Sequence, residues 1–353
     1  MKTVYNYKSR NPKDNPVFFG DPIGLQRYDR LKYKKFYDLA VKMEKLIWSP
    51  DEVSLLKDKG DYMALSDTEK FIFDQNIFWQ TSTDAMLSRS IDQLLPYVTN
   101  TELEKAMKVW SYFESNIHSF SYSHIFKSIH GNETPIWDAI EDDEEIQRRA
   151  AEAKAEWDAL MNLDEEEDKR KHIFRSIVAF NVVEGLSFHI SFACSFAFAY
   201  QGKMEGNAKI IALIARDELL HHALTTEILK VMRDNPDEGF QDVYDEKFIR
   251  DAYELALKQE NRWIEFLFQK GDILGFTKQQ MLDFADHRAY YMLNLLKIET
   301  PGRKIKENPI GRMYNQFINK SAVQVAPQET EIESYQIAST DAQVDFDALK
   351  DFL

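Results

Sequence analysis

Two glutamate–histidine pairs stand at helical spacing in this chain. Glu114 precedes His118 by four residues, and Glu218 precedes His221 by three. An α-helix turns about 100° per residue, so residues three or four apart project from one face. Each pair can therefore direct a carboxylate and an imidazole at the same ion. Such ligands suit iron or manganese, and without thiolates a structural zinc site is disfavoured.

Two further carboxylates, Asp84 and Glu184, lie in apolar stretches that come before the two pairs. A buried carboxylate without a partner costs several kcal/mol or takes up a proton. Two divalent cations would balance the charge of four carboxylates, which removes this objection. The six residues together therefore predict a dinuclear metal centre inside a helix bundle.

The histidine of the second pair is ambiguous, because His222 also lies within reach of Glu218. Its spacing of four residues matches that of the first pair, whereas His221 follows at three. Neighbouring helical residues point about 100° apart, so only one of these imidazoles can face the metal centre. Spacing alone leaves the choice open, and the other histidine is expected beside the site or at the surface.

Tyr122 follows His118 by one helical turn, which places it about 6 Å further along the helix axis. A phenol beside a metal pair that activates oxygen can be oxidised to a radical. This register predicts a radical enzyme. The competing interpretation of a single tyrosine on a helix is core or interface packing.

Helices must bring these residues together, and the sequence predicts an all-α fold. Glycine (12) and proline (10) are scarce, and stretches with helical apolar periodicity separate them. Ser66 to Glu69 and Thr101 to Glu104 have the pattern of capping boxes at two helix starts. The predicted helices cover residues about 23–46, 66–95, 101–131, 145–161, 169–201, 205–233, 246–270 and 277–298.

The composition excludes several kinds of partner and setting. A formal net charge of −15 argues against binding to nucleic acid. The single cysteine, Cys194, excludes an internal disulfide and fits a cytoplasmic protein, with a buried hydrophobe favoured over a reactive thiol. The apolar run 177–200 contains Asn181, Glu184 and His189, so it predicts a buried helix rather than a membrane span. The N-terminal residues lack the apolar segment of a signal peptide.

The chain divides into three predicted parts. Residues 1–22 are expected to form an N-terminal arm, residues 23–320 a dimetal helical domain, and residues 321–353 a flexible tail. Residues 328–353 hold seven acidic side chains and one lysine. The apolar residues near the end suit docking into a partner's groove, and the alternative is a plain solubilising tail.

With these residues in place, the chain resembles the small (β) subunit of class I ribonucleotide reductase. The resemblance covers nearly the whole chain, and its motifs are specific. The segments that carry it are residues 117–125, 191–199, 204–211, 214–221 and 323–329. It implies a ferritin-like helical bundle with additional helices, which forms a homodimer. It also implies a dinuclear iron centre, with manganese or a mixed manganese–iron pair as alternatives.

The resemblance implies roles for single residues wherever the motifs match. The implied metal ligands are Asp84, Glu114, His118, Glu184, Glu218 and His221. This settles the choice between the two histidines in favour of His221. The implied radical site is Tyr122, in an apolar pocket of Phe188, Phe192 and Ile214. The implied electron route runs through Trp48, Asp217 and, in the tail, Tyr335. The competing interpretation of Trp48 and of the three pocket residues is ordinary core packing, which for the pocket residues is compatible with the implied role. For Asp217, which can accept a hydrogen bond from an imidazole N–H, the competing interpretation is a surface salt bridge.

One feature departs from the family pattern. Many members have two residues between the first glutamate and its histidine, whereas here there are three, and Ser115 holds the place that the glutamate usually takes. Four-residue spacing still keeps both side chains on one face. The site is therefore expected to survive, with Glu114 reaching the metal through a different rotamer or a local helix distortion.

The implied function is to generate a radical for a large (α) subunit, which reduces ribonucleotides to deoxyribonucleotides. In the family that reduction uses several cysteines of the large subunit, and this chain has one. Residues 328–353 are expected to dock to that partner. Activation uses oxygen directly or an accessory flavoprotein. The competing functions are a dimetal monooxygenase or desaturase, a ferritin-like iron store, and a radical-free family member with a higher-valent metal pair.

Overall fold

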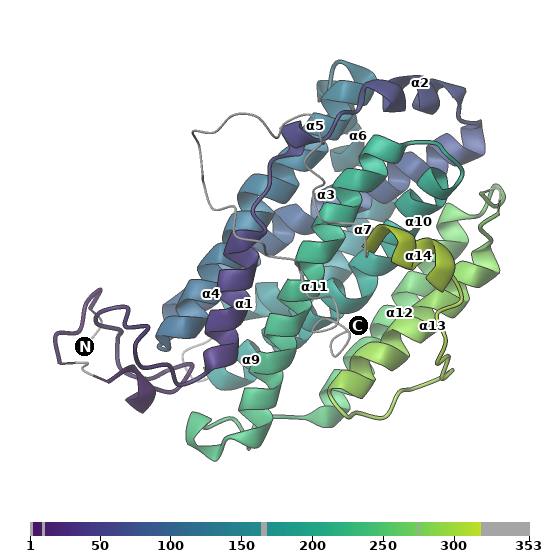
Figure 1. The fold of residues 1–353 in the computed structure, drawn as a ribbon. Helices are drawn as coiled ribbons and strands as arrows, with labels where there is room; N and C mark the ends of the chain where they lie inside the picture. The colour runs from purple at the N-terminus through teal and green to yellow at the C-terminus, as the bar shows by residue number, and fades with distance from the viewer. Residues whose placement is uncertain (1–2, 9–10, 164–167, 274, 319–353) are drawn as a thin grey trace, which may run out of the picture.

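The computed structural model describes residues 3–8, 11–163, 168–273 and 275–318, and Figure 1 shows them as a bundle of long helices with shorter ones around it. The described residues contain no β-strand, only two isolated bridges, Phe18 with Val98 and Ile273 with Phe276. The prediction of an all-α fold is confirmed.

The helices follow one another in a simple order along the chain. The α-helices are α1 (Lys34–Lys45), α2 (Leu56–Ala64), α3 (Asp67–Leu94), α4 (Thr101–Tyr112), α5 (Ser119–His130), α6 (Thr134–Asp142), α7 (Glu144–Ala153), α8 (Ala155–Met161), α9 (Lys169–Val182), α10 (Phe188–Tyr200), α11 (Glu205–Asp234), α12 (Glu246–Leu267), α13 (Lys278–Leu295) and α14 (Gly311–Ile318). Two π-helical segments, η4 (Phe113–His118) and η5 (Val183–Ser187), join α4 to α5 and α9 to α10. Short 3₁₀ turns are η1 (Pro12–Asp14), η2 (Pro50–Glu52), η3 (Leu95–Tyr97) and η6 (Pro236–Glu238).

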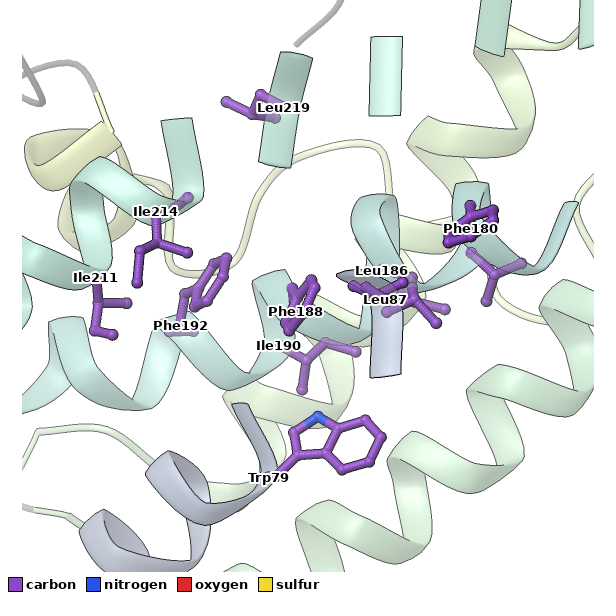
Figure 2. Close-up of a cluster of buried hydrophobic side chains, with 14 of the residues drawn as sticks. Trp79, Leu87, Phe180, Leu186, Phe188, Ile190, Phe192, Ile211, Ile214 and Leu219 are labelled. Atoms are coloured by element: carbon purple, nitrogen blue, oxygen red, sulfur yellow. The ribbon is translucent and has the colours of Figure 1, made fainter. Parts of the chain in front are cut away.

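Four long helical rods form the centre of the bundle: α3, α4–η4–α5, α9–η5–α10 and α11. The first rod packs against the second, and α11 packs against α9, η5 and α10. Apolar side chains from these rods fill the interior (Figure 2), among them Trp79, Leu87, Leu186, Phe188, Phe192 and Ile214. Burial of each such side chain contributes about 1.5–3 kcal/mol to the stability of the fold. The apolar interior therefore holds the four rods together.

The start of α3 agrees with the predicted capping box, whereas the start of α4 does not. The Ser66 hydroxyl accepts from the Glu69 amide, and the Glu69 carboxylate accepts from the Ser66 amide. At α4 the cap is Asn100, whose side chain accepts from the Leu103 amide. The prediction of a Thr101 cap is wrong, because an asparagine one residue earlier makes this bond equally well.

Two predicted helices have different bounds. The helix expected from residue 23 begins only at Lys34, because the buried Glu102 carboxylate accepts the amides of Lys32 and Tyr33 and holds the chain before α1 outside a helix. The helix expected over residues 145–161 is divided into α7 and α8 at Lys154, whose ψ of −5° interrupts the helix.

The short helices α2, α6 and α14 were not predicted. With 9, 9 and 8 residues they are too short to be stable alone. Tertiary contacts supply what sequence periodicity lacks. The buried carboxylate of Asp58 in α2 accepts the amides of Gly206 and Asn207, and so caps the start of α11.

Residues 169–200 are the one described segment that is long and apolar enough to cross a membrane, and 94% of its apolar window is buried inside the protein. The interpretation as a buried core helix therefore holds. Cys194 lies within this segment, and burial raises the pKa of its thiol. It is the buried hydrophobe that the sequence predicted.

Candidate metal centre

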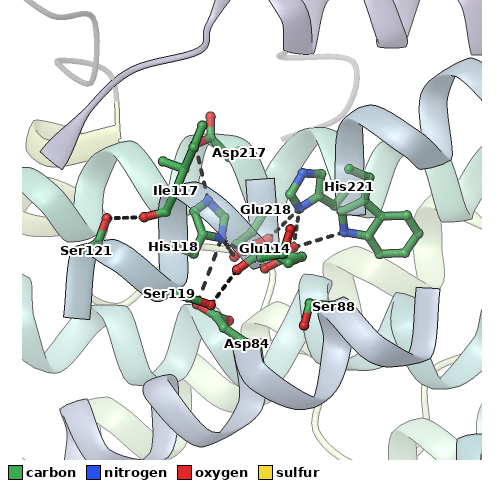
Figure 3. A network of polar contacts seen from close by, with 12 residues as sticks. Asp84, Ser88, Glu114, Ile117, His118, Ser119, Ser121, Asp217, Glu218 and His221 are labelled. Carbon is green, nitrogen blue, oxygen red and sulfur yellow. Dashed lines mark hydrogen bonds and ion pairs between the residues drawn. The ribbon is translucent and has the colours of Figure 1, made fainter. Parts of the chain in front are cut away.

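Four carboxylates and two imidazoles meet between the four rods. Figure 3 labels five of these six residues, Asp84, Glu114, His118, Glu218 and His221. Each of the six is at most 1% exposed. α3 supplies Asp84, η4 supplies Glu114 and His118, η5 supplies Glu184, and α11 supplies Glu218 and His221. All six predicted metal ligands are therefore in one place.

The ligand atoms form two overlapping groups. Asp84, Glu114, His118 and Glu218 make one group, and Glu114, Glu184, Glu218 and His221 make the other; within each, the ligand atoms lie within 4.8 Å of one another. Glu114 and Glu218 belong to both. This arrangement suits two adjacent cations with two shared carboxylates between them.

Both histidines direct the same ring nitrogen at the carboxylates. His118 Nδ1 lies 3.0 Å from Glu114 Oε2 and 3.3 Å from Glu218 Oε1. His221 Nδ1 lies 2.7 Å from Glu218 Oε2 and 3.0 Å from Glu114 Oε1. The rings thus have the orientation that metal ligation requires.

His222 lies outside both groups, which resolves the ambiguity left by its spacing. Its Nε2 lies 3.5 Å from the Thr226 hydroxyl, and the residue is 2% exposed. Burial and the nearby Arg288 charge lower the pKa of His222 to about 3, so the imidazole is neutral. Of the two positions expected for the histidine that is not a ligand, His222 has the one beside the site and not the one at the surface.

The four buried carboxylates lie so close together that, without cations, most of them resist ionisation. Burial, together with neighbouring carboxylates, raises the pKa values of Asp84 and Glu184 well above their usual range and that of Glu218 to about 8. Glu114 is the exception: burial opposes its ionisation, but His118 and His221 lower its pKa to about 2.

Several buried oxygens of the site also lack hydrogen-bond partners among the described residues. They are Asp84 Oδ1 and both carboxylate oxygens of Glu184. Unpartnered buried oxygens are costly, and divalent cations satisfy such atoms and neutralise the carboxylates. The donor set therefore fits a dinuclear metal centre.

Glu114 sits in the π-helical segment η4. Of the two alternatives that the four-residue spacing left open, a different rotamer or a local helix distortion, the structure shows the distortion. Its Oε1 accepts the indole N–H of Trp110 at 3.0 Å, and its carbonyl accepts the Ser119 hydroxyl at 2.7 Å. Ser115, which holds the usual glutamate position, is exposed and donates to the Ser111 carbonyl. The distortion thus turns Glu114, and not Ser115, toward the site.

Glu184 sits in a second π-helical segment, η5, that the sequence did not predict. Arg288 of α13 donates from Nε and Nη2 to the Gly185 carbonyl, at 3.0 and 2.5 Å. Sequence reasoning also missed Trp110 as a partner of Glu114. Its i, i−4 position on the same helix was the available signal, whereas nothing local points to Arg288.

Tyr122 is fully buried and donates its phenolic hydrogen bond to Asp84 Oδ2 at 2.6 Å. Burial and the Asp84 charge raise the pKa of this phenol well above its usual range. Phe188, Phe192 and Ile214 are also fully buried in the same core. The rings of Phe188 and Phe192 stack at 5.5 Å, and Ile214 lies beside Phe192 in Figure 2.

A chain of side chains leads outward from His118. Its Nε2 lies 3.4 Å from Asp217 Oδ2, and the same oxygen accepts the Trp48 indole N–H at 2.8 Å. Asp217 is 1% exposed, and Arg216 contacts its other oxygen at 2.8 Å. Burial alone would raise the pKa of Asp217, but Arg216, His118 and Trp48 hold it below its usual range. The alternative of a surface salt bridge is therefore wrong. Tyr335 lies outside the described residues.

Comparisons with known proteins found a matching family and similar sequences. A family model described as "Ribonucleotide reductase, small chain" matches residues 26–309. The ribonucleoside-diphosphate reductase 1 subunit beta of Salmonella typhimurium is 33% identical over 374 residues, and the match covers 99% of each chain.

Two solved structures have the same fold. The ribonucleotide reductase R2 subunit from Clostridium botulinum has a TM-score of 0.81 at 23% identity, covering 90% of this chain and 98% of that one. Dimanganese(II)-NrdF of Streptococcus sanguinis has a TM-score of 0.69 at 19% identity, covering 85% and 100%. These likenesses confirm the predicted ferritin-like helical fold.

Proposed function

The chain belongs to the small-chain family of ribonucleotide reductases, and from that premise we propose a specific role for its buried site. The family identifies the protein as an oxidoreductase subunit that supports ribonucleotide reduction. We propose that it is the radical-generating subunit of a class I enzyme, with the radical formed on Tyr122. The hydrogen bond from Tyr122 to a carboxylate of the metal centre carries this proposal.

The six clustered residues would hold the metal pair, and Glu114 and Glu218 belong to both groups of ligand atoms. Once oxidised, a bound pair of iron or manganese ions supplies the oxidising power that a phenol requires. Oxygen and nitrogen ligands accept either metal. Iron is our first expectation. Manganese or a mixed pair is the alternative, because a structural neighbour is a dimanganese protein.

Asp84 gives the phenolic proton a place to go. Forming a neutral tyrosyl radical removes one electron and one proton from Tyr122. Asp84 Oδ2 already accepts this hydrogen bond at 2.6 Å, so the proton moves along an existing contact.

The apolar surroundings protect the radical from water and reductants. Tyr122, Phe188, Phe192 and Ile214 are each 0% exposed. The fold keeps them in one continuous core, which supports the proposed pocket of Phe188, Phe192 and Ile214 around the radical.

His118, Asp217 and Trp48 provide a contact path that leads away from the six clustered residues. Asp217 orients the His118 imidazole and the Trp48 indole at once, because both lie against one carboxylate oxygen. Its depressed pKa keeps it an acceptor. We propose that the radical passes along this path and then to Tyr335.

The partners follow from the same role. We propose that residues 328–353 dock to the large subunit, where ribonucleotides are reduced, and that this chain acts as a homodimer in the cytoplasm. Activation by oxygen alone, or with an accessory flavoprotein, completes the proposal.

Electron paramagnetic resonance (EPR) of the oxidised protein tests the assignment. We expect a tyrosyl resonance in the wild type that disappears in Tyr122→Phe while metal content is retained. That substitution removes only the hydroxyl and leaves the ring in the core. A tyrosyl resonance unchanged by this substitution would refute the role of Tyr122.

A further inference from the structure

Arg288 is a buried cation, 4% exposed, and no carboxylate among the described residues forms a salt bridge with it. Its described partners are the Gly185 carbonyl and the Met292 sulfur, 3.8 Å away. A buried charge is costly unless it is paired. The position of this guanidinium therefore calls for an explanation beyond packing.

The carbonyl that Arg288 contacts belongs to η5, the segment that carries Glu184. A π-helical segment departs from the regular helical hydrogen-bond ladder, and such segments are often found at functional sites. Two donors from one planar guanidinium hold this carbonyl from outside the helix. Gly185 directly follows Glu184, so fixing its peptide group also fixes the backbone from which the Glu184 carboxylate projects.

The side chains of His222 and Met292 pack closely against Gly185 and limit its movement further. A Cβ at this position would lie 2.4 Å from His222 Cδ2 and 3.0 Å from Met292 Sδ. Two helices therefore pack against η5. α11 contacts it through His222, and α13 contacts it through Arg288 and Met292. The segment is confined by tertiary contacts, whereas the Glu184 carboxylate itself has no hydrogen-bond donor among the described residues.

We infer that Arg288 is a positioning residue of the metal centre, which holds the η5 backbone so that Glu184 reaches the ion shared with His221. The inference rests on the proposed dinuclear centre. Arg288 touches no ligand atom, so it acts through the Gly185 carbonyl. Losing such a supporting contact commonly weakens metal binding about 10–100-fold.

Manganese titration separates this role from a merely structural one. Free Mn(II) is counted by EPR while Mn(II) is added to metal-free protein. We expect the wild type to bind two ions per chain. In Arg288→Met the ion at Asp84 and His118 should bind normally, and the ion at Glu184 and His221 about 10–100-fold more weakly. Arg288→Lys keeps a single donor and should recover part of that loss, which also provides a test if the methionine variant folds poorly.

Two comparisons identify the cause of any loss. Glu184→Ala defines the binding curve of a protein without this ligand, and adding Arg288→Met to it should weaken binding no further, because both changes act on one ligand. Arg149→Met removes another buried guanidinium, one that pairs with Glu260 at 2.6 Å. It should lower the unfolding temperature but leave both manganese sites intact.

Each alternative result has a separate meaning. Equal weakening of both ions in Arg288→Met, or a further loss in the double variant, would overturn the positioning role. So would unchanged binding in Arg288→Met. If the wild type failed to bind two ions, the metal centre itself would be refuted and this inference with it. If only the variant comparison failed, the proposed function would stand.

Discussion

Both η4 and η5 widen a long helix at a residue that faces the metal centre, but partners at different distances along the chain hold them. In η4, Trp110 and Ser119 contact Glu114 across four and five residues of the same rod. In η5, the contact comes from Arg288, 103 residues away. One distortion is supported locally and the other by the tertiary fold.

The carboxylates that the two segments carry, Glu114 on η4 and Glu184 on η5, also differ in how they are held. Glu114 has Trp110 and both imidazoles around its oxygens, whereas neither oxygen of Glu184 has a hydrogen-bond partner among the described residues. The pKa of Glu114 lies near 2, while burial and neighbouring carboxylates raise that of Glu184. Before metal binds, η4 therefore presents an ordered anion. The raised pKa of Glu184 favours its neutral form, and this ligand depends on the η5 backbone for its position.

Gly185→Ala should have the largest effect of these variants, because it displaces the η5 backbone that carries Glu184. The added methyl would overlap the His222 ring, and overpacking of this kind costs about 1–3 kcal/mol. We expect a lower free energy of unfolding in urea and loss of the manganese ion at Glu184. Gly60→Ala in α2 is the matched control, because a Cβ there meets nothing within 4 Å; it should leave manganese binding unchanged. Normal binding of two ions by Gly185→Ala would show that η5 tolerates displacement.

Trp110→Phe should weaken the hold of η4 on the Glu114 carboxylate while keeping an aromatic ring in place. It removes the N–H that donates to Glu114 Oε1 at 3.0 Å. Because Glu114 is shared, both manganese ions should bind more weakly, by about tenfold. Trp263→Phe is the control, since its buried indole N–H has no partner among the described residues. Weakening of only one ion would argue against a shared Glu114.

The proximity of Glu114 and His118 could be predicted because the relevant signal, their spacing, is local. Its departure from the family pattern left a different rotamer or a local helix distortion open, and the structure shows the distortion. Capping patterns, glycines and prolines mark the ends of the long rods, so their bounds were predicted to within a few residues. Where such local signals lie on one helix, the placement of its side chains follows from the sequence.

The sequence did not predict η5, because its determinants lie on other helices. Arg288 and His222 reach Gly185 from α13 and α11, and no local pattern relates them. The short helix α2 was missed for a similar reason, since its buried Asp58 is satisfied by the start of α11. The choice between His221 and His222 likewise needed either the family motif or the assembled structure.

The different pKa values of the two sides predict a pH effect on the metal-free protein. An acid with a raised folded pKa stabilises the fold below its unfolded pKa, about 4.3 for glutamate, and this contribution is lost as pH rises through the folded value. For Glu218 that value is about 8. The raised pKa of His118 acts in the same direction, whereas the low pKa of Glu114 makes its contribution constant above its unfolded value.

We therefore expect the unfolding temperature of the metal-free protein to fall between about pH 5 and pH 8. Manganese binds deprotonated ligands, so the gap between metal-loaded and metal-free protein should widen over the same interval. Scanning calorimetry of both forms measures this. Glu218→Gln, which cannot ionise, should flatten the metal-free profile. A gap that narrows as pH rises would contradict the ionisation states assigned to Glu184 and Glu218.

Ser119→Ala should have the smallest effect and tests whether support of η4 is redundant. It removes the hydroxyl bond to the Glu114 carbonyl, worth about 0.5–1.5 kcal/mol, but the Ser119 amide still donates to that carbonyl. Trp110 and the imidazoles still hold the carboxylate. We expect a slightly lower unfolding temperature and unchanged manganese binding, with the exposed Ser115→Ala as the control. If Ser119→Ala instead weakened manganese binding as much as Arg288→Met, η4 would depend on a single contact just as η5 does, and local support would confer no advantage.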